Sequence, residues 1–239
     1  MFYLNQSKYV NTIIKLYGYV DVKPAPTPMR VDANLVKETT LQASKQQIAD
    51  YDARIGSLNF LSIQTRPDIS LAVSILSQFM TNPNESHWKA LERVFAYIKA
   101  TPNRGPTYRK DAKHGGLIGY TDSDWAGDRI ERRSTGGYIF LLYGAPISWK
   151  SKRQSCIALS TAEAEYIAAC EAAKEAIYFK STVNTFLPIE KSLSTITIME
   201  DNQACIRIGL NPELHQRTKH IDIKYHYLRD QIRKGNIRL

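Results

Sequence analysis

Residues 119–128, "GYTDSDWAGD", are the stretch from which the fold of this chain can be worked out. They continue the apolar stretch "GGLI" at 115–118, and the two stretches together predict a buried strand. Asp122 and Asp124 lie at the end of that strand, and Asp128 follows four residues after Asp124. Neighbouring carboxylates repel one another and lose solvation on burial, so their presence at the end of a buried strand calls for an explanation.

The segments that follow this strand alternate between strand-like and helix-like patterns. We expect two strands joined by a tight turn at 143–146, then a long helix, a fourth strand, two further helices and the start of a last strand. The expected strands and helices cover 135–144, 145–151, 160–182, 194–201, 202–210, 218–235 and 236–239. This order is typical of an α/β domain built on a mixed sheet.

The first part of the chain has a different, mostly helical pattern. Apolar residues at helical spacing predict a helix within 1–23 and a helical unit over 48–101, in which Ser86 is the expected N-cap of the last helix. Alternate prolines within 23–30 predict an extended connector. We place a domain boundary near Lys113, giving domains 1–113 and 114–239.

The composition is that of a globular protein with a polyanionic partner. Of 239 residues, 43% are hydrophobic and 23% charged, and no apolar run approaches the ~20 residues that span a membrane. The N-terminus lacks the pattern of a signal peptide, and three widely spaced cysteines favour a reducing compartment. The net charge of +9 favours nucleic-acid binding, with a merely soluble basic surface as the alternative.

Three carboxylates are expected to converge. Asp122 and Asp201 end the first and fourth strands, and these ends coincide if the strands are adjacent and parallel. Glu165 lies in the first turns of the long helix, on the same side as the small residues Ala169, Ala172 and Ala176. We choose Glu165 over Glu163, because Ser160 and Glu163 fit a capping box. Such a set of oxygens suits a pair of Mg²⁺ ions and phosphoryl chemistry.

Each carboxylate also has an ordinary structural explanation. Asp201 is well placed to cap the helix that starts at Asn202. Asp122 fits a turn with Ser123 and Asp124, and Glu165 fits an ion pair with a lysine.

Several specific stretches resemble the ribonuclease H (RNase H) domain of copia-type retrotransposon Pol polyproteins. They are "DSDWAGD" (122–128), "RRSTGGY" (132–138), "ISWKSKRQ" (147–154), "LSTAEAEY" (159–166) and "RTKHIDIKYH" (217–226), within a similarity that is nearly continuous from about 116 onward. Residues 4–29 are similar to the segment just after the polymerase palm of the reverse transcriptase, and residues 54–80 and 87–101 resemble its thumb and connection region. The resemblance therefore covers most of the chain.

The resemblance implies an α/β, RNase H-like mixed sheet with flanking helices, preceded by a mostly helical thumb/connection-like module. It implies hydrolysis of the RNA strand of RNA–DNA hybrids with Mg²⁺, or Mn²⁺, bound by Asp122, Glu165 and Asp201. The polymerase's Tyr-x-Asp-Asp motif is absent from this chain. The family's fourth carboxylate and last helix lie beyond Leu239, so we expect a C-terminally truncated domain, which puts its activity in doubt.

Basic and polar residues around the predicted site are candidates for contacts with phosphates and 2′-hydroxyls. They are Arg132, Arg133, Ser134, Lys150, Lys152, Arg153, Asn202, Arg217 and Lys219. For the basic residues within 150–153, the alternative to nucleic-acid binding is that they simply keep the end of a strand solvated. His215, His220 and His226 do not make a convincing zinc site, because no cysteine lies at finger spacing from them.

The sequence thus predicts an RNase H-type endonuclease whose partners are an RNA–DNA hybrid and the remainder of the Pol polyprotein. No membrane and no small-molecule cofactor is expected. By the same resemblance it would act in the cytoplasm within a virus-like particle, or in the nucleus. Two alternatives stay open: a catalytically impaired nucleic-acid-binding remnant of a decayed retrotransposon, and, less favoured, a DDE-type integrase or transposase.

Overall fold

The computed structural model describes residues 1–31, 33, 35–37, 42–109, 116–124, 133–186, 193–210 and 222–239, with the backbone alone at 222–225. The chain divides into two compact units, Met1–Thr107 and Tyr108–Leu239, and each is considered by itself. The boundary predicted near residue 113 lies outside the described residues. No helix among the described residues is long and apolar enough to cross a membrane.

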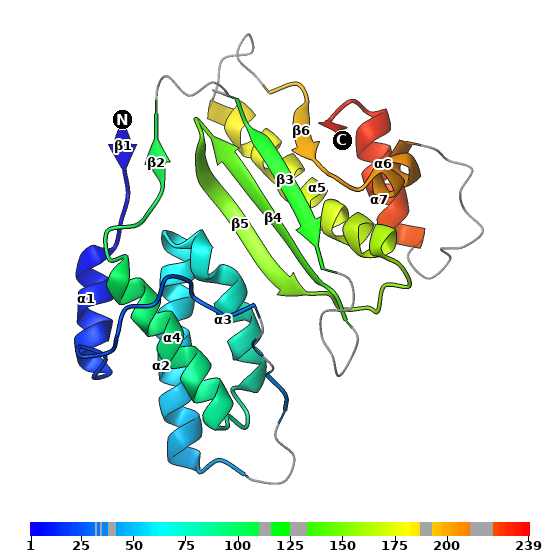
Figure 1. The fold of residues 1–239 in the computed structure, drawn as a ribbon. Coiled ribbons are helices and arrows are strands. Elements are labelled where there is room, and N and C mark those ends of the chain that lie inside the picture. Colours follow the sequence, from blue (N-terminus) through cyan, green and yellow to red (C-terminus); the bar gives the residue numbers. More distant parts are fainter. Residues whose placement is uncertain are drawn as a thin grey trace. The chain divides into compact units, whose positions relative to one another are not determined.

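The first unit is mostly helical, as its sequence pattern predicts (Figure 1). Its helices are α1 (Ser7–Leu16), α2 (Lys45–Gln64), α3 (Ser70–Leu76) and α4 (Glu85–Ala100), with the 3₁₀ turns η1 (Pro67–Ile69) and η2 (Ser77–Phe79) around α3. The short strands β1 (Phe2–Tyr3) and β2 (Thr107–Tyr108) pair with each other.

The prediction that Ser86 caps α4 was wrong. Asn84 is the N-cap: its side chain accepts a hydrogen bond from the backbone N–H of His87, and the His87 ring accepts one from the backbone N–H of Asn84. Ser86 instead donates its hydroxyl to Asn84. Two good capping residues stand two positions apart, and the reciprocal contact with His87 selects the first.

A partly buried ion pair at η1 fastens this turn to the end of α4 within the first unit. Arg66 is 1% exposed, and its guanidinium donates to both carboxylate oxygens of Asp68 at 2.9 Å and to the backbone and hydroxyl oxygens of Thr101. Tyr97 also donates to Asp68. Burial works to raise the pKa of Asp68, but these donors outweigh it and hold that pKa below its usual range.

The second unit is a five-stranded mixed sheet with helices, which confirms the predicted α/β class. The strands are β3 (Ile118–Ser123), β4 (Thr135–Leu142), β5 (Ala145–Arg153), β6 (Ile196–Met199) and β7 (Ile237–Arg238), in the order β5-β4-β3-β6-β7. Pairs β5–β4 and β4–β3 are antiparallel, and pairs β3–β6 and β6–β7 are parallel. The helices are α5 (Thr161–Phe186), α6 (Gln203–Leu210) and α7 (Asp222–Arg233).

The turn between β4 and β5 is shorter than predicted. It consists of Tyr143 and Gly144, which have φ values of 50° and 75°. Positive φ at both central residues matches the two-residue hairpin turn whose twist suits adjoining antiparallel strands. Pro146, expected in the turn, belongs to β5, where it is tolerated because β5 is an edge strand.

Helix α5 lies against one face of the sheet, over β3 and β4 (Figure 1). The buried surface of the helix is rich in alanine: Ala164, Ala169, Ala172, Ala173 and Ala176 are fully buried between the sheet and the neighbouring helices. A methyl group placed on Gly136 would lie 3.2 Å from the methyl group of Ala168. Small side chains on both elements therefore allow a close approach.

The pairing of β3 with β4 leaves no room for a side chain at Gly119. Gly119 lies directly opposite Phe140, and a methyl group on Gly119 would lie 2.6 Å from the Phe140 ring. Because Phe140 is fully buried, its ring has little freedom to move aside.

We therefore expect Gly119→Ala to lower the free energy of unfolding by about 1–3 kcal/mol, the usual cost of overpacking. Urea unfolding followed by circular dichroism measures this change. Gly116→Ala is the matched control, because nothing lies within 4 Å of a methyl group there. Equal stability of the two variants would contradict the packing described.

Candidate metal centre

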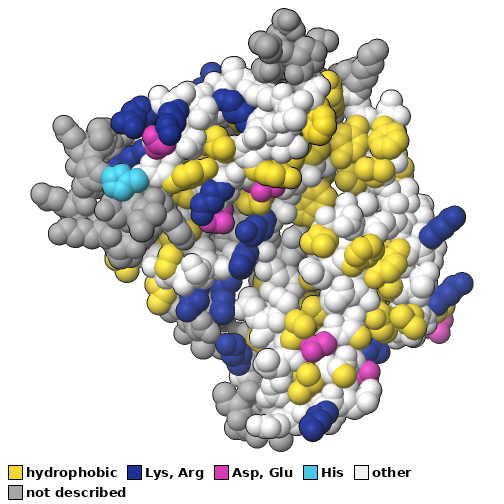
Figure 2. Space-filling model, turned by 180° about the vertical axis from the view of Figure 1, so that it is seen from behind, with side chains coloured by type: hydrophobic (Ala, Val, Ile, Leu, Met, Phe, Trp, Pro, Cys, Tyr) yellow, Lys and Arg dark blue, Asp and Glu magenta, His cyan; other side chains and the backbone are white. Residues whose placement is uncertain are grey.

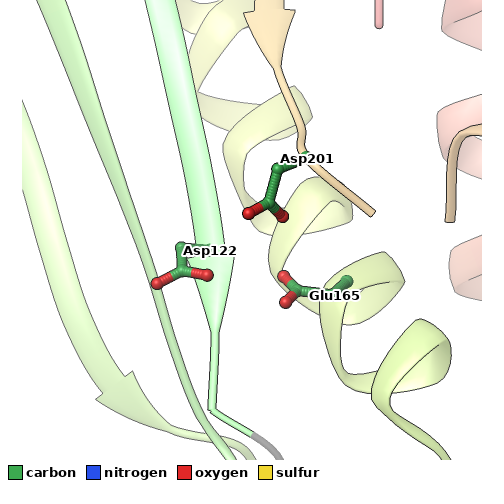
Figure 3. A group of neighbouring side chains, drawn as sticks. All are labelled: Asp122, Glu165 and Asp201. Carbon is green, nitrogen blue, oxygen red and sulfur yellow. The ribbon is translucent and has the colours of Figure 1, made fainter. Parts of the chain in front are cut away.

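Three carboxylates from distant parts of the sequence meet at one end of the second unit's sheet. Asp122 belongs to β3, Asp201 follows β6 by two residues, and Glu165 lies in the second turn of α5. Each offers an oxygen that lies within 4.8 Å of the oxygens of the other two. Figure 3 shows the three side chains, carried by β3, by α5 and by the segment after β6.

The parallel pairing of β3 with β6 brings these residues together. Tyr120 pairs with Met199 in a parallel ladder, so the two strands end at the same edge of the sheet. Asp122 and Asp201, each two residues further along, therefore lie side by side. This arrangement is the one expected for ligand sites at the carboxyl ends of parallel strands.

Glu165 is the buried member of the group. It is 4% exposed, and its Oε2 atom has no hydrogen-bond partner among the described residues. The backbone N–H of Ser123 donates to its carboxylate. Burial, and then the charges of Glu200, Asp122 and Asp201, raise the pKa of Glu165 from 4.5 to about 8. A carboxylate so poorly compensated fits a bound cation.

The structure separates the two helix glutamates as the sequence suggested. Glu163 accepts a hydrogen bond from the backbone N–H of Leu159 at 2.7 Å, and its own N–H donates to the Ser160 hydroxyl. Glu163 therefore serves the start of α5, while Glu165 is directed toward the two aspartates.

The structural roles that the sequence suggested for Asp201 and Asp122 are filled by neighbouring residues. Asn202 caps α6, because its side-chain oxygen accepts hydrogen bonds from the N–H groups of Ala204 and Cys205 at 3.0 Å. Asp124 takes the loop role, since its carboxylate accepts a hydrogen bond from the N–H of Thr135. Asp122 lies in a paired strand position opposite Gly137. No ion pair joins Glu165 to a lysine within the described ranges.

Glu200 is a fourth carboxylate at this centre, and it was not among the residues predicted from the sequence. Its Oε1 accepts a hydrogen bond from the N–H of Asn202 at 3.0 Å, and its Oε2 is buried with no hydrogen-bond partner in the described part of the chain. Burial is the main cause that raises its pKa, followed by the charge of Asp201 among others. Strand alternation could have identified Glu200, because Ile196 and Ile198 face inward and Glu200 is the next residue on the same face.

The basic candidates are only partly described. Lys150, Lys152 and Arg153 lie on β5, and Arg133 and Ser134 precede β4. Ser134 is fully buried, and its carbonyl accepts a hydrogen bond from the N–H of Gln154. Arg132, Arg217, Lys219, His215 and His220 lie outside the described residues. Within the described ranges, the carboxylate centre is the one group of metal-ligating side chains found.

Comparison with known proteins places the chain in a family. It is 36% identical over 234 residues to the retrovirus-related Pol polyprotein from transposon TNT 1-94 of Nicotiana tabacum, a match covering 96% of this chain and 17% of that protein. It is 37% identical over 237 residues to the corresponding polyprotein from transposon RE1 of Arabidopsis thaliana, covering 99% of this chain and 16% of that protein. The chain thus spans about a sixth of the length of these relatives.

A third relative is short. The chain is 45% identical over 135 residues to the secreted RxLR effector protein 161 of Plasmopara viticola, a match covering 56% of this chain and 93% of that protein. No protein-family model matches the chain. The chain belongs to the copia-type retrotransposon Pol polyproteins.

The electrostatics of the centre predict how stability depends on pH without metal. The folded state holds a proton on Glu165 up to about pH 8, whereas the unfolded chain loses it near 4.5. The folded state therefore binds more protons between these values, and stability falls as pH rises through that window.

We expect Glu165→Gln to remove this fall in stability with rising pH. In EDTA at pH 8, the variant should be more stable than the wild type by roughly 1–3 kcal/mol, because about 1.4 kcal/mol accompanies each pKa unit of mismatch. At pH 5 the difference should nearly vanish. Thermal unfolding across pH measures both. Glu163→Gln, which weakens the contacts at the start of α5, should be destabilised at both pH values.

Proposed function

We propose that residues 108–239 form an RNase H-like domain that hydrolyses the RNA strand of RNA–DNA hybrids as part of a retrotransposon Pol polyprotein. The observation that carries the proposal is the meeting of Asp122, Glu165 and Asp201 at the carboxyl ends of two parallel strands. The sheet order and the resemblance of the motifs around these residues support the same assignment. An element copied from RNA into DNA passes through such a hybrid, which supplies a substrate of this class.

Divalent magnesium fits the side chains at this centre. All three candidate ligands are carboxylates, which are hard oxygen donors of the kind Mg²⁺ prefers, and no cysteine or histidine belongs to the group. The unpartnered oxygen of Glu165 leaves a buried negative charge that a cation would compensate. When bound, a pair of Mg²⁺ ions would supply an activated water and stabilise the leaving oxygen.

The protein's own contribution is to hold the carboxylates in place before substrate arrives. The N–H of Ser123 fixes one oxygen of Glu165, and α5 cannot shift easily because its alanines are buried in the core of the unit. Asp122 and Asp201 remain exposed, so the open side of the centre can receive a phosphodiester.

Cations beside the centre would hold the nucleic-acid backbone. Lys150 and Lys152 are exposed on β5, which lies two strands from Asp122. Lys and Arg side chains are prominent in the view of Figure 2. Their attraction for phosphates is independent of sequence, as expected of an enzyme that acts on any hybrid.

The first unit fits a second part of the same polyprotein. Its helices α2 to α4 contain the stretches that resemble the reverse-transcriptase thumb and connection region. We assign it that role on this resemblance.

A cleavage assay tests the proposed activity. The full chain, with Mg²⁺ and a hybrid labelled on the RNA strand, should cut that strand, and Asp122→Asn should reduce the rate about 100-fold or more, as when a group that stabilises charge in the transition state is removed. Asp124→Asn is the matched control, because an asparagine oxygen can still accept the hydrogen bond from Thr135. Hybrid binding without cleavage by the wild type would favour the nucleic-acid-binding remnant instead.

Metal binding can be tested separately from activity. Mg²⁺ at about ten times its dissociation constant should stabilise the wild type by about 1.4 kcal/mol, since a ligand bound only by the folded state shifts unfolding by mass action. Differential scanning fluorimetry measures the shift. Asp201→Asn should abolish it, and an equal shift in that variant would contradict the assignment of Asp201 as a ligand.

A further inference from the structure

A second cavity lies beside the carboxylate centre, on the face of the sheet that α5 covers. It has a volume of about 330 Å³, within the range of small-molecule sites. Its walls come from the start of β4, the end of β5 and the middle of α5. None of the three proposed metal ligands lines it, so it is a separate feature.

Part of the sheet side of this cavity carries no side chains. Gly136 and Gly137 line it from β4, and Ala168 lines it from α5. Glycine within a strand often marks a place where a ligand approaches the backbone closely. Tyr138 and Ile167 add apolar surface, so the cavity can accept a ring as well as an anion.

Cations stand at the β5 side of the same cavity. Strand alternation puts Lys150 and Lys152 on the face toward α5, since Ser148, two residues earlier, hydrogen-bonds Glu175 of that helix. The ammonium of Lys150 lies 3.7 Å from the Glu171 carboxylate, a long and half-exposed pair. The ammonium of Lys152 has no hydrogen bond or ion pair to any residue that the structure describes.

A buried polar side chain also belongs to the wall. Gln154 is 7% exposed and donates from its amide nitrogen to the carbonyl of Ala164 at 2.9 Å. Its side-chain oxygen has no hydrogen-bond partner among the described residues. Buried amide oxygens usually have a partner, so this one indicates a missing donor at the cavity wall.

The strand register places the cavity close to the centre. Gly136 is the direct partner of both Ser123 in β3 and Lys152 in β5. Neighbouring strands lie about 4.8 Å apart, so Lys152 is roughly 10 Å from the strand end that carries Asp122. One nucleic-acid strand can therefore reach both places.

We propose that this cavity binds one nucleotide unit, with the phosphate on Lys152 and Lys150 and the sugar or base over Gly136 and Gly137. Two sources offer that chemistry: a nucleotide within the strand held at the carboxylates, and a free mononucleotide. The first source rests on the proposed nuclease function, whereas the cavity's affinity for a nucleotide does not.

The experiment is a calorimetric titration of the full chain in EDTA with adenosine 5′-monophosphate, inorganic phosphate and adenosine. The monophosphate should bind about tenfold more tightly than either fragment, because both halves of the cavity are used. Lys152→Glu should weaken its binding about tenfold or more, and Glu171→Gln should strengthen it by freeing Lys150 from a competing carboxylate. Opposite effects of two changes in one cavity distinguish binding from misfolding.

Lys8→Glu is the matched control, since it makes the same charge change on an exposed residue of α1 in the first unit. Absence of binding, equal affinity for phosphate alone, or equal weakening by Lys8→Glu would overturn the proposal. Since EDTA removes divalent metal, these outcomes do not depend on hydrolysis. The hybrid assay then identifies the source: Lys152→Glu should raise KM with little change in kcat if the nucleotide belongs to the bound strand, whereas unchanged KM would assign the cavity to free nucleotides.

Discussion

The close packing of α5 on β3 and β4 is the constraint on which the second unit depends. It requires small residues on both elements, with Gly136 in β4 facing Ala168 and buried alanines along the helix. Packing at this distance fixes the rotation of α5 about its own axis. Glu165 therefore meets Asp122 and Asp201 from a rigid element, and Glu163 is left to serve the start of the helix. A bulkier helix face would keep the sheet but displace the centre.

The cost of this arrangement is a concentration of negative charge around a buried carboxylate. The protein compensates Glu165 with one backbone N–H donor and surrounds it with Glu200 and two aspartates. In the first unit the opposite holds for Asp68, which pairs with the Arg66 guanidinium and accepts a hydrogen bond from the Tyr97 hydroxyl. The two carboxylates thus differ in their surroundings: Asp68 is hydrogen-bonded by several donors within the chain, whereas one oxygen of Glu165 has no partner among the described residues.

Much of the fold and of the carboxylate centre could be predicted from the sequence, because apolar periodicity and strand ends are local properties. The strand that ends at Asp122 and the helix that holds Glu165 follow from such patterns. The position of Asp201 relative to Asn202 could not be settled that way, since both are good capping residues and only the hydrogen bonds to Asn202 decide. Glu200 was missed although alternation with Ile198 points to it. The contact between Gly119 and Phe140 depends on strand register, which no local pattern specifies.

The pairing of β3 with β6 also determines when the centre can come into existence. Tyr120 and its partner Met199 are 79 positions apart (199 − 120), whereas β3, β4 and β5 are joined by neighbouring segments. As a ribosome releases the chain from its N-terminus, the antiparallel strands and α5 emerge well before β6. Until β6 arrives, Asp122 and Glu165 lack their third partner. The nascent chain therefore cannot assemble the three carboxylates until its synthesis has passed residue 201.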